Sequence, residues 1–310
     1  MKIMYFRGKY PNFGDELNIW MWEKLLPDFF DDDENELFIG IGSTIGNHYK
    51  KSAKKIVFGT GFVPTYNEKP DVNTSDWDIY FVRGPRTTKS LDISPDLALG
   101  DAAILLRTIV DYKNRKPEVI SFIPHWESLE RGNWEEVCKI AGINLIDPRR
   151  PVEEVINELL RSKLVICEAM HGAIVSDAFR IPWIPILPLE KIHRDKWYDW
   201  AEALEIELLP KRLIISSIHE AKTAKYLNTT NNYSSKPNHT LTTEQNKSLL
   251  GKKSISVVKT IVRQVILYMS AYRLRMIAKT SPNLSKDEII DGVTKKMLEK
   301  LDILRQNYSK

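Results

Sequence analysis

The sequence predicts an α/β protein made of two consecutive sheet-and-helix units and a helical extension. Over the first two thirds of the 310 residues, short apolar runs alternate with longer amphipathic segments, which is typical of parallel strands joined by helices. This alternation stops at the polar, proline-terminated stretch 111–117 and then restarts, so we expect a linker there. Beyond about residue 211, a polar tract and two long helical patterns replace it.

The first unit, residues 1–113, is expected to contain four strands and two helices. The strands are predicted at 2–6, 37–41, 56–58 and 79–82, and the helices at 16–26 and 85–91. Pro85 suits the first position of the second helix. Each strand ends in glycine or polar residues, which supports a parallel sheet covered by helices.

The second unit, residues 114–215, repeats this rhythm. Strands are predicted at 119–123, 144–146, 164–167, 183–187 and 206–208, and helices at 134–141, 152–160, 172–180 and 196–204. The remainder, 216–310, is predicted as a flexible Asn-, Thr- and Ser-rich tract at 228–247 and helices at 250–279 and 286–306. Ser285 and Glu288 have the spacing of a capping box at the last helix.

Composition places the chain among soluble globular proteins. It is 43% apolar and 28% charged, and it has no apolar run long enough to span a bilayer. The N-terminus lacks the apolar region of a secretory signal, so we expect the cytoplasm. Cys138 and Cys167 lie in apolar segments and are expected to be buried free thiols. The net charge of +4 is modest, and we expect no nucleic-acid partner.

Positive charge is concentrated near the C-terminus. From Glu244 to Thr280, eight Lys and Arg residues accompany one acid, and apolar residues recur at three- and four-residue spacings. This basic amphipathic helix, 250–279, is predicted to contact the anionic inner face of the plasma membrane. The alternative is that it packs across the two domains and keeps its lysines in water.

One candidate catalytic residue is His171. The apolar strand 164–167 ends just before it, and a helix is predicted to begin just after it. In open α/β sheets, ligands bind beyond the carboxyl ends of the strands, and a helix N-terminus there attracts anions. His171 is therefore placed to exchange protons with an anionic ligand.

Other strand ends carry further candidates. Asn12, Gly14 and Asp15 follow the first strand; Asp15 is expected either to orient or deprotonate a sugar hydroxyl, or to cap the helix. Gly42 lies in a glycine pair that permits close approach of a ligand, but without a dinucleotide fingerprint the favoured interpretation is a tight turn.

Two arginines follow the fourth predicted strand, and a second histidine ends the first strand of the second unit. Arg83 and Arg86 suit a carboxylate or phosphate, and the alternative for each is a surface ion pair. His125 is placed like His171, so the two histidines are expected either to converge on one ligand or to be structural. Without cysteine partners at suitable spacing, no metal site is predicted, and no Walker, zincin or nucleophile-elbow motif is present.

Taken in order, these segments resemble the polysaccharide pyruvyl transferase family, the bacterial exopolysaccharide ketal-pyruvyl transferases. The resemblance covers about residues 1–210 and rests on 12–15, 40–43, 59–61, 83–87, 100–101, 123–125 and 170–172 with Asp177. It implies two Rossmann-like domains in a GT-B-type arrangement, with the first on the acceptor side and the second on the donor side.

The resemblance also implies roles for individual residues. The essential histidine of the family maps onto His171, and its anion-binding arginine onto Arg83. Matching motif positions give the remaining expected substrate-binding residues, which are Arg86, His125, Asn12, Gly14, Gly42, Met170 and Gly172. Many members have Arg-Leu-His where this chain has Ala169-Met170-His171, and Arg180 and Arg194 are candidates to replace the missing arginine.

The expected reaction is transfer of pyruvate from phosphoenolpyruvate to two hydroxyls of a glycan or lipid-linked oligosaccharide, with His171 and Asp15 as catalytic residues. No cofactor or metal is expected beyond this donor substrate. A GT-B glycosyltransferase that uses a nucleotide sugar is the alternative enzyme. The alternative without catalysis is a peripheral membrane or scaffold protein in which residues 250–279 are the functional part.

Overall fold

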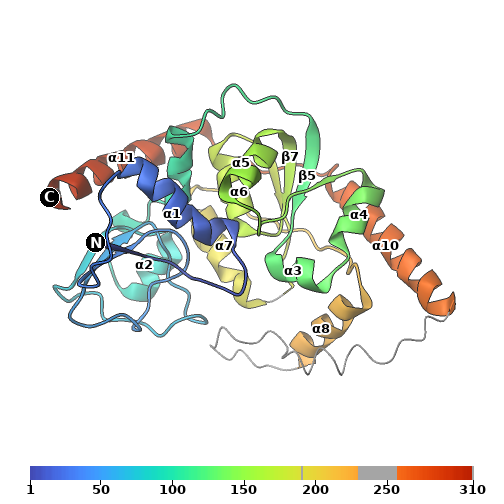
Figure 1. Ribbon diagram of the computed structural model, residues 1–310, viewed down its shortest axis with the longest axis horizontal. Helices are drawn as coiled ribbons and strands as arrows, with labels where there is room; N and C mark the ends of the chain where they lie inside the picture. The colour runs from blue at the N-terminus through green and yellow to red at the C-terminus, as the bar shows by residue number, and fades with distance from the viewer. Residues whose placement is uncertain (190, 230–256, 309–310) are drawn as a thin grey trace.

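Two parallel four-stranded sheets form the body of the protein (Figure 1). The computed structural model describes residues 1–189, 191–229 and 257–308. The strand orders are β1-β2-β3-β4 and β6-β5-β7-β8, and every pairing within the sheets is parallel. The α/β class predicted from the sequence is therefore confirmed. The division at residues 113 and 215 stays a prediction.

The first sheet contains β1 (Lys2–Met4), β2 (Glu36–Ile39), β3 (Lys54–Phe58) and β4 (Trp77–Phe81). Its helices are α1 (Phe13–Leu25), α2 (Pro85–Leu91) and the short 3₁₀ turns η1 (Pro95–Leu97) and η2 (Ala102–Thr108). Successive side chains of a strand point to opposite faces, so Phe38 enters the main core while Leu37 and Ile39 enter the core on the other face. Burial on both faces explains the continuous apolar run Leu37–Ile39 of β2.

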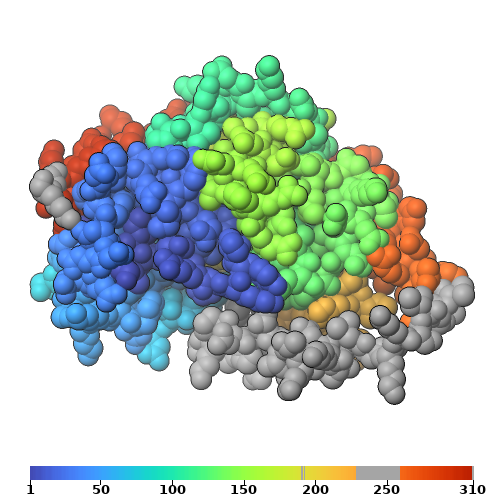
Figure 2. Space-filling model, in the orientation of Figure 1, coloured from blue at the N-terminus to red at the C-terminus, as the bar shows by residue number. Residues whose placement is uncertain are grey.

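The second sheet contains β5 (Val119–Ile123), β6 (Asn144–Leu145), β7 (Ser162–Cys167) and β8 (Trp183–Pro185). Its helices are α3 (Trp126–Arg131), α4 (Trp134–Ala141), α5 (Val152–Leu160), α6 (Met170–Ala178), η3 (Lys191–His193) and α7 (Asp195–Ala203). On the face shown in Figure 2, α1 (blue) lies directly against the yellow-green α5 and α6, so the two units share one core.

One expected strand is absent from the described part of the structure, and two helices there were not expected. Residues 206–208 are not a strand; instead Lys211 makes an isolated parallel bridge to Ile186, and Leu208 packs into the main core. Three residues give too little pattern to separate a strand from a buried loop. Helices α3 and α8 (Ile218–Thr229) were not predicted.

The C-terminal helices α10 (Val257–Ile277) and α11 (Asp287–Tyr308) pack on different units. Helix α10 lies along α4, whereas α11 places Met297, Leu301 and Leu304 in the main core. Most of the predicted polar tract, from residue 230 onward, lies outside the described residues, as do residues 250–256 of the first predicted helix. In the part of the chain that the structure describes, we find no helix with the length and hydropathy of a membrane span.

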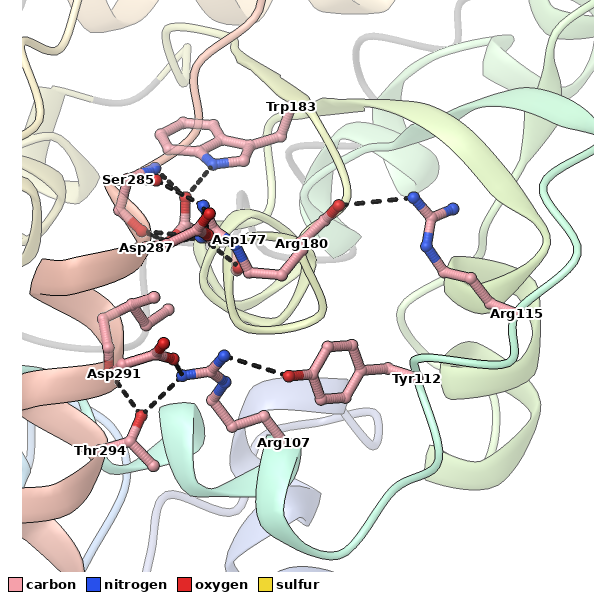
Figure 3. A network of polar contacts seen from close by, with 11 residues as sticks. Arg107, Tyr112, Arg115, Asp177, Arg180, Trp183, Ser285, Asp287, Asp291 and Thr294 are labelled. Atoms are coloured by element: carbon pink, nitrogen blue, oxygen red, sulfur yellow. Dashed lines mark hydrogen bonds and ion pairs between the residues drawn. The ribbon is translucent and has the colours of Figure 1, made fainter.

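A buried carboxylate of α6 holds the start of α11 (Figure 3). Asp177 accepts hydrogen bonds from the Trp183 indole at 2.9 Å and from the backbone N–H and hydroxyl of Ser285. Arg180 adds an ion pair to Asp287 at 2.8 Å. The predicted capping box is therefore wrong, because the Ser285 hydroxyl donates to Asp177 and α11 begins two residues later.

A second set of contacts in Figure 3 fastens α11 to the first unit. Arg107 of η2 donates to Asp291 at 2.6 Å and to Thr294 at 3.1 Å, and also to the Tyr112 hydroxyl. Tyr112 lies in the expected linker and stacks on Phe179 of α6. The linker and α11 thus both bridge the two units.

Candidate functional site

The carboxyl ends of the two sheets meet through contacts between side chains. The Tyr66 hydroxyl, after β3, lies 2.6 Å from Nδ1 of His193, which follows β8. Arg83, after β4, pairs with Asp199 of α7. The candidate site lies at this junction, where open α/β sheets bind their ligands.

As predicted, His171 lies just beyond the carboxyl end of β7; it is in the first turn of α6, which begins two residues before the predicted start at 172. Its Nε2 is 3.7 Å from Oδ2 of Asp101, and its side chain is 15% exposed. Neither atom has a hydrogen-bond partner within the described residues. Any side chain at position 14 would overlap the imidazole, so Gly14 gives the ring its room. Nε2 is therefore buried and faces the Asp101 carboxylate, which is suited to orienting the imidazole for proton exchange.

Asp101 belongs to the first unit and is fully buried. Its Oδ1 accepts a hydrogen bond from the backbone of Ala103 at 3.0 Å, which caps η2. This bond fixes the carboxylate and directs Oδ2 toward His171. Residue 101 appeared in the sequence only as part of a Gly-Asp pair, and its pairing with a histidine 70 positions away became visible only in the fold.

Asp15 lies close enough to His171 and Lys196 to interact electrostatically with both side chains. Burial raises the pKa of the Asp15 carboxyl, while a 2.7 Å hydrogen bond from Asn12 and the charges of His171 and Lys196 oppose that rise. Asn12 occupies the N-cap position of α1, so the helix-cap alternative for Asp15 is wrong. The pairing with Asn12 orients the carboxylate.

Lys196 is one residue of this site that the sequence analysis did not single out. It lies in the first turn of α7, and burial followed by repulsion from Arg83 lowers its pKa from 10.5 to about 8. The charges of Asp15, Glu127 and Asp101 partly offset this shift. A cation in this position is suited to an anionic ligand.

Arg83 does not project as a free cation, because it is 1% exposed. Its Nε donates to Asp199 at 3.0 Å, and its Nη1 donates to the Gly42 carbonyl and the Ser43 hydroxyl. Nη2 has no partner among the described residues. The surface-pair alternative is wrong because the pair is buried, and an anion-binding role for Arg83 would have to use Nη2.

Arg86 forms the surface ion pair that the sequence left open as an alternative. Its guanidinium binds both carboxylate oxygens of Glu202, at 2.6 to 3.1 Å, and both side chains are nearly half exposed. It also lies over the Tyr198 ring. Because its guanidinium is already paired with Glu202, Arg86 is not proposed to bind the substrate.

His125 joins a second cluster, with Glu127 and His193. Its Nδ1 and the Nε2 of His193 each lie 3.3 Å from Oε2 of Glu127. Burial lowers the pKa of both histidines; it would raise that of Glu127, but the histidine hydrogen bonds lower it well below 4.5. His125 therefore contacts Glu127 and, through it, His193, and its convergence with His171 stays a prediction.

This cluster has the donor types of a metal site, with ligand atoms within 4.8 Å of one another. However, Arg131 lies 3.5 Å from Glu127. The positive charge of Lys196 also acts on both histidines and lowers their pKa. Because these cations already compensate the carboxylate, a divalent ion would meet repulsion there. We assign no metal to it.

Beside this cluster, Glu168 directly follows β7. It accepts hydrogen bonds from the His125 backbone and the Ser128 hydroxyl, and burial raises its pKa to about 7. Glu168 also lines an open pocket of about 400 Å³, together with Trp134 and Glu220. The rule that ligands meet strand ends would have identified Glu168 from the sequence.

The remaining predicted binding positions shape the backbone. Gly42 has φ +122° and offers its carbonyl to Arg83. Met170 packs into the main core, and Gly172 lies against Ile123, where a side chain would clash. Of the two replacement arginines, Arg180 holds the start of α11, and Arg194 donates to the Pro188 carbonyl.

Comparison with known proteins identifies the family of the chain. The family model described as polysaccharide pyruvyl transferase matches residues 7–188. The chain is 38% identical over 224 residues to the succinoglycan biosynthesis protein ExoV of Rhizobium meliloti (strain 1021), covering 71% of this chain and 70% of that protein. No solved structure matches. The matched segment includes His171, Asp101, Asp15 and Arg83, and the chain belongs to the polysaccharide pyruvyl transferase family.

Proposed function

We propose that this protein transfers pyruvate from phosphoenolpyruvate onto two hydroxyls of one sugar in an exopolysaccharide or lipid-linked oligosaccharide intermediate, forming a cyclic ketal. The observation that carries the proposal is the Asp101–His171 pair beside Lys196, within the segment that matches the family. The succinoglycan protein ExoV supports an exopolysaccharide acceptor.

The reaction requires proton transfer at carbon and oxygen. Protonation of the methylene carbon of phosphoenolpyruvate makes the neighbouring carbon electrophilic, and a sugar hydroxyl adds there as it loses its proton. The C–O bond to phosphate then breaks, and a second hydroxyl adds to the same carbon. Of the two hydroxyl protons, one balances the new methyl group and the other leaves on phosphate, so no oxidant or cofactor is needed.

Each group at the site has a role in this scheme. His171 exchanges protons through its imidazole, and Asp101, which faces Nε2, orients the ring and stabilises its protonated form. Lys196 and Nη2 of Arg83 bind the carboxylate or phosphate of the donor. Asp15, held by Asn12, orients or deprotonates a sugar hydroxyl.

We further infer that the two units are Rossmann-like domains in a GT-B-type arrangement, with the acceptor on the first and the donor on the second. The meeting of both carboxyl edges at one junction supports this arrangement. A nucleotide-sugar glycosyltransferase fits the same architecture, but the family match favours pyruvyl transfer.

The test uses purified wild type, His171→Ala and, as a matched control, His219→Ala on α8. Each protein is incubated with phosphoenolpyruvate and candidate oligosaccharides, while phosphate release and the mass of the pyruvyl ketal are followed. We expect both products from wild type and the control, and a loss of about 100-fold or more in His171→Ala. Equal turnover by His171→Ala would remove this residue from the mechanism.

A further inference from the structure

Helix α10 has two apolar faces, and only one of them is covered by the rest of the described protein. Leu267, Ala271, Leu274 and Ile277 are buried against the core of the second unit. On the opposite face, seven large apolar residues are 39% to 66% exposed: Ile261, Val262, Val265, Tyr268, Met269, Tyr272 and Met276. A helix with apolar residues on both faces is normally buried, and a large exposed apolar patch normally marks a surface that binds another molecule.

The seven residues form one continuous stripe. At about 100° per residue, their directions centre opposite the buried face, and the stripe from 261 to 276 is about 22 Å long. Figure 1 shows α10 along the outer edge of the second unit, beside α4 and away from α11. The stripe is therefore a long apolar surface on the outside of α10, and it is not enclosed in a pocket.

The charge of the same helix selects the partner. Residues 257–279 contain no acid and five cations, which are Lys259, Arg263, Arg273, Arg275 and Lys279. Arg263 pairs with Glu136, whereas Arg273 and Arg275 donate to backbone carbonyls of residues 212 and 141 and keep their full charge. A second copy of this chain docked on the stripe would bring like charges together.

We propose that this face of α10 binds the surface of an anionic membrane, with Tyr268 and Tyr272 at the level of the lipid headgroups. An apolar stripe lying in the interface satisfies the exposed side chains, and anionic headgroups satisfy the flanking cations. Tyrosine suits this depth because its ring is apolar and its hydroxyl is polar. The inference does not depend on the pyruvyl reaction.

The test compares full-length proteins in co-sedimentation with vesicles of phosphatidylcholine alone or with about 30% phosphatidylglycerol. We expect wild type to bind the anionic vesicles and to lose affinity between about 0.1 M and 0.5 M salt. The variant Val265→Gln/Tyr268→Gln/Tyr272→Gln should bind about tenfold or more weakly. A matched control, Leu284→Gln/Leu298→Gln/Ile303→Gln, replaces exposed apolar residues at or on α11 and should bind like wild type.

A second readout tests orientation. Both native cysteines are buried, so a cysteine placed at Val265 can be labelled selectively with an environment-sensitive dye. We expect a blue shift with anionic vesicles at position 265 and none for Lys113→Cys in the exposed linker. Equal binding by wild type and the α10 variant, or no dye shift at 265, would overturn the proposal. Sedimentation showing a wild-type dimer that the α10 variant dissociates would instead make the stripe a protein interface.

Discussion

Two titratable side chains at the junction carry shifted pKa values for the same reason, which is burial, but with opposite signs. Lys196 loses basicity because its charged form is desolvated and repelled by Arg83. Glu168 loses acidity because its carboxylate is desolvated. Each shift gives a prediction that can be checked by changing pH.

In the proposed reaction, Lys196 must be protonated to bind the anionic donor. Because its pKa is about 8, kcat/KM for phosphoenolpyruvate should fall as pH rises through that value. Lys196→Arg keeps its charge at all these pH values and should move the fall to higher pH, whereas Lys196→Met should lose about 10- to 100-fold at neutral pH. A profile with the same upper limit in wild type and Lys196→Arg would contradict this role.

Glu168 should lower the stability of the folded protein as pH rises. Its pKa is raised from 4.5 to about 7, so the folded state keeps a proton that the unfolded state releases in this range. The resulting penalty grows from about pH 4.5, is complete above about 7 and amounts to roughly 3 kcal/mol. In urea unfolding, the stability of Glu168→Gln relative to wild type should increase by about this amount between about pH 4.5 and 7. A stability difference that does not change with pH would refute the shift.

At the scale of elements, a short polar anchor holds the start of α11. Its first residues are held by the buried carboxylate of Asp177, and its apolar face enters the main core. Helix α10, by contrast, buries one face and exposes the other. Similar sequence patterns therefore led to two helices with different surroundings.

Ser285→Ala should destabilise the protein by about 1 to 3 kcal/mol, because Asp177 would lose a hydrogen-bond donor inside the core. Ser281→Ala, at an exposed position of the preceding turn, is the matched control and should change stability by less than about 0.5 kcal/mol. Thermal unfolding of the three proteins measures the difference. Equal midpoints for both variants would mean that the anchor adds nothing.

At the scale of the whole molecule, two ion pairs join the α2 region to α7 in different environments. Arg83 and Asp199 are almost fully buried, and Asp199 also accepts two hydrogen bonds from Thr87. Arg86 and Glu202 are both exposed by more than two fifths. The buried pair bridges the two units and supports the site, while the exposed pair lies at the edge.

These pairs should differ sharply when one partner is neutralised. Asp199→Asn leaves the Arg83 guanidinium buried without its counter-charge and should cost about 3 kcal/mol or more. Glu202→Gln removes an exposed partner and should cost less than about 1 kcal/mol. Denaturant unfolding of both variants compares them directly, and similar losses would show that burial does not govern this junction.

The sequence by itself determined the α/β class, most strands and helices, and the position of His171 at a strand end. Helix and strand periodicity are local, so α2, α4, α5 and β5 were predicted with the bounds that the structure has. Local patterns failed where partners are distant: Ser285 bonds to Asp177 rather than to its own helix.

Only the tertiary structure decided which charges face one another. Lys196 approaches Arg83, Asp15 and Asp101, and Asp101 approaches His171, because segments at the carboxyl ends of the two sheets meet. It also decided that Arg83 is buried against Asp199 while Arg86 stays at the surface. Electrostatic environment depends on distance in space and on desolvation, and neither quantity is contained in the spacing of residues along the chain.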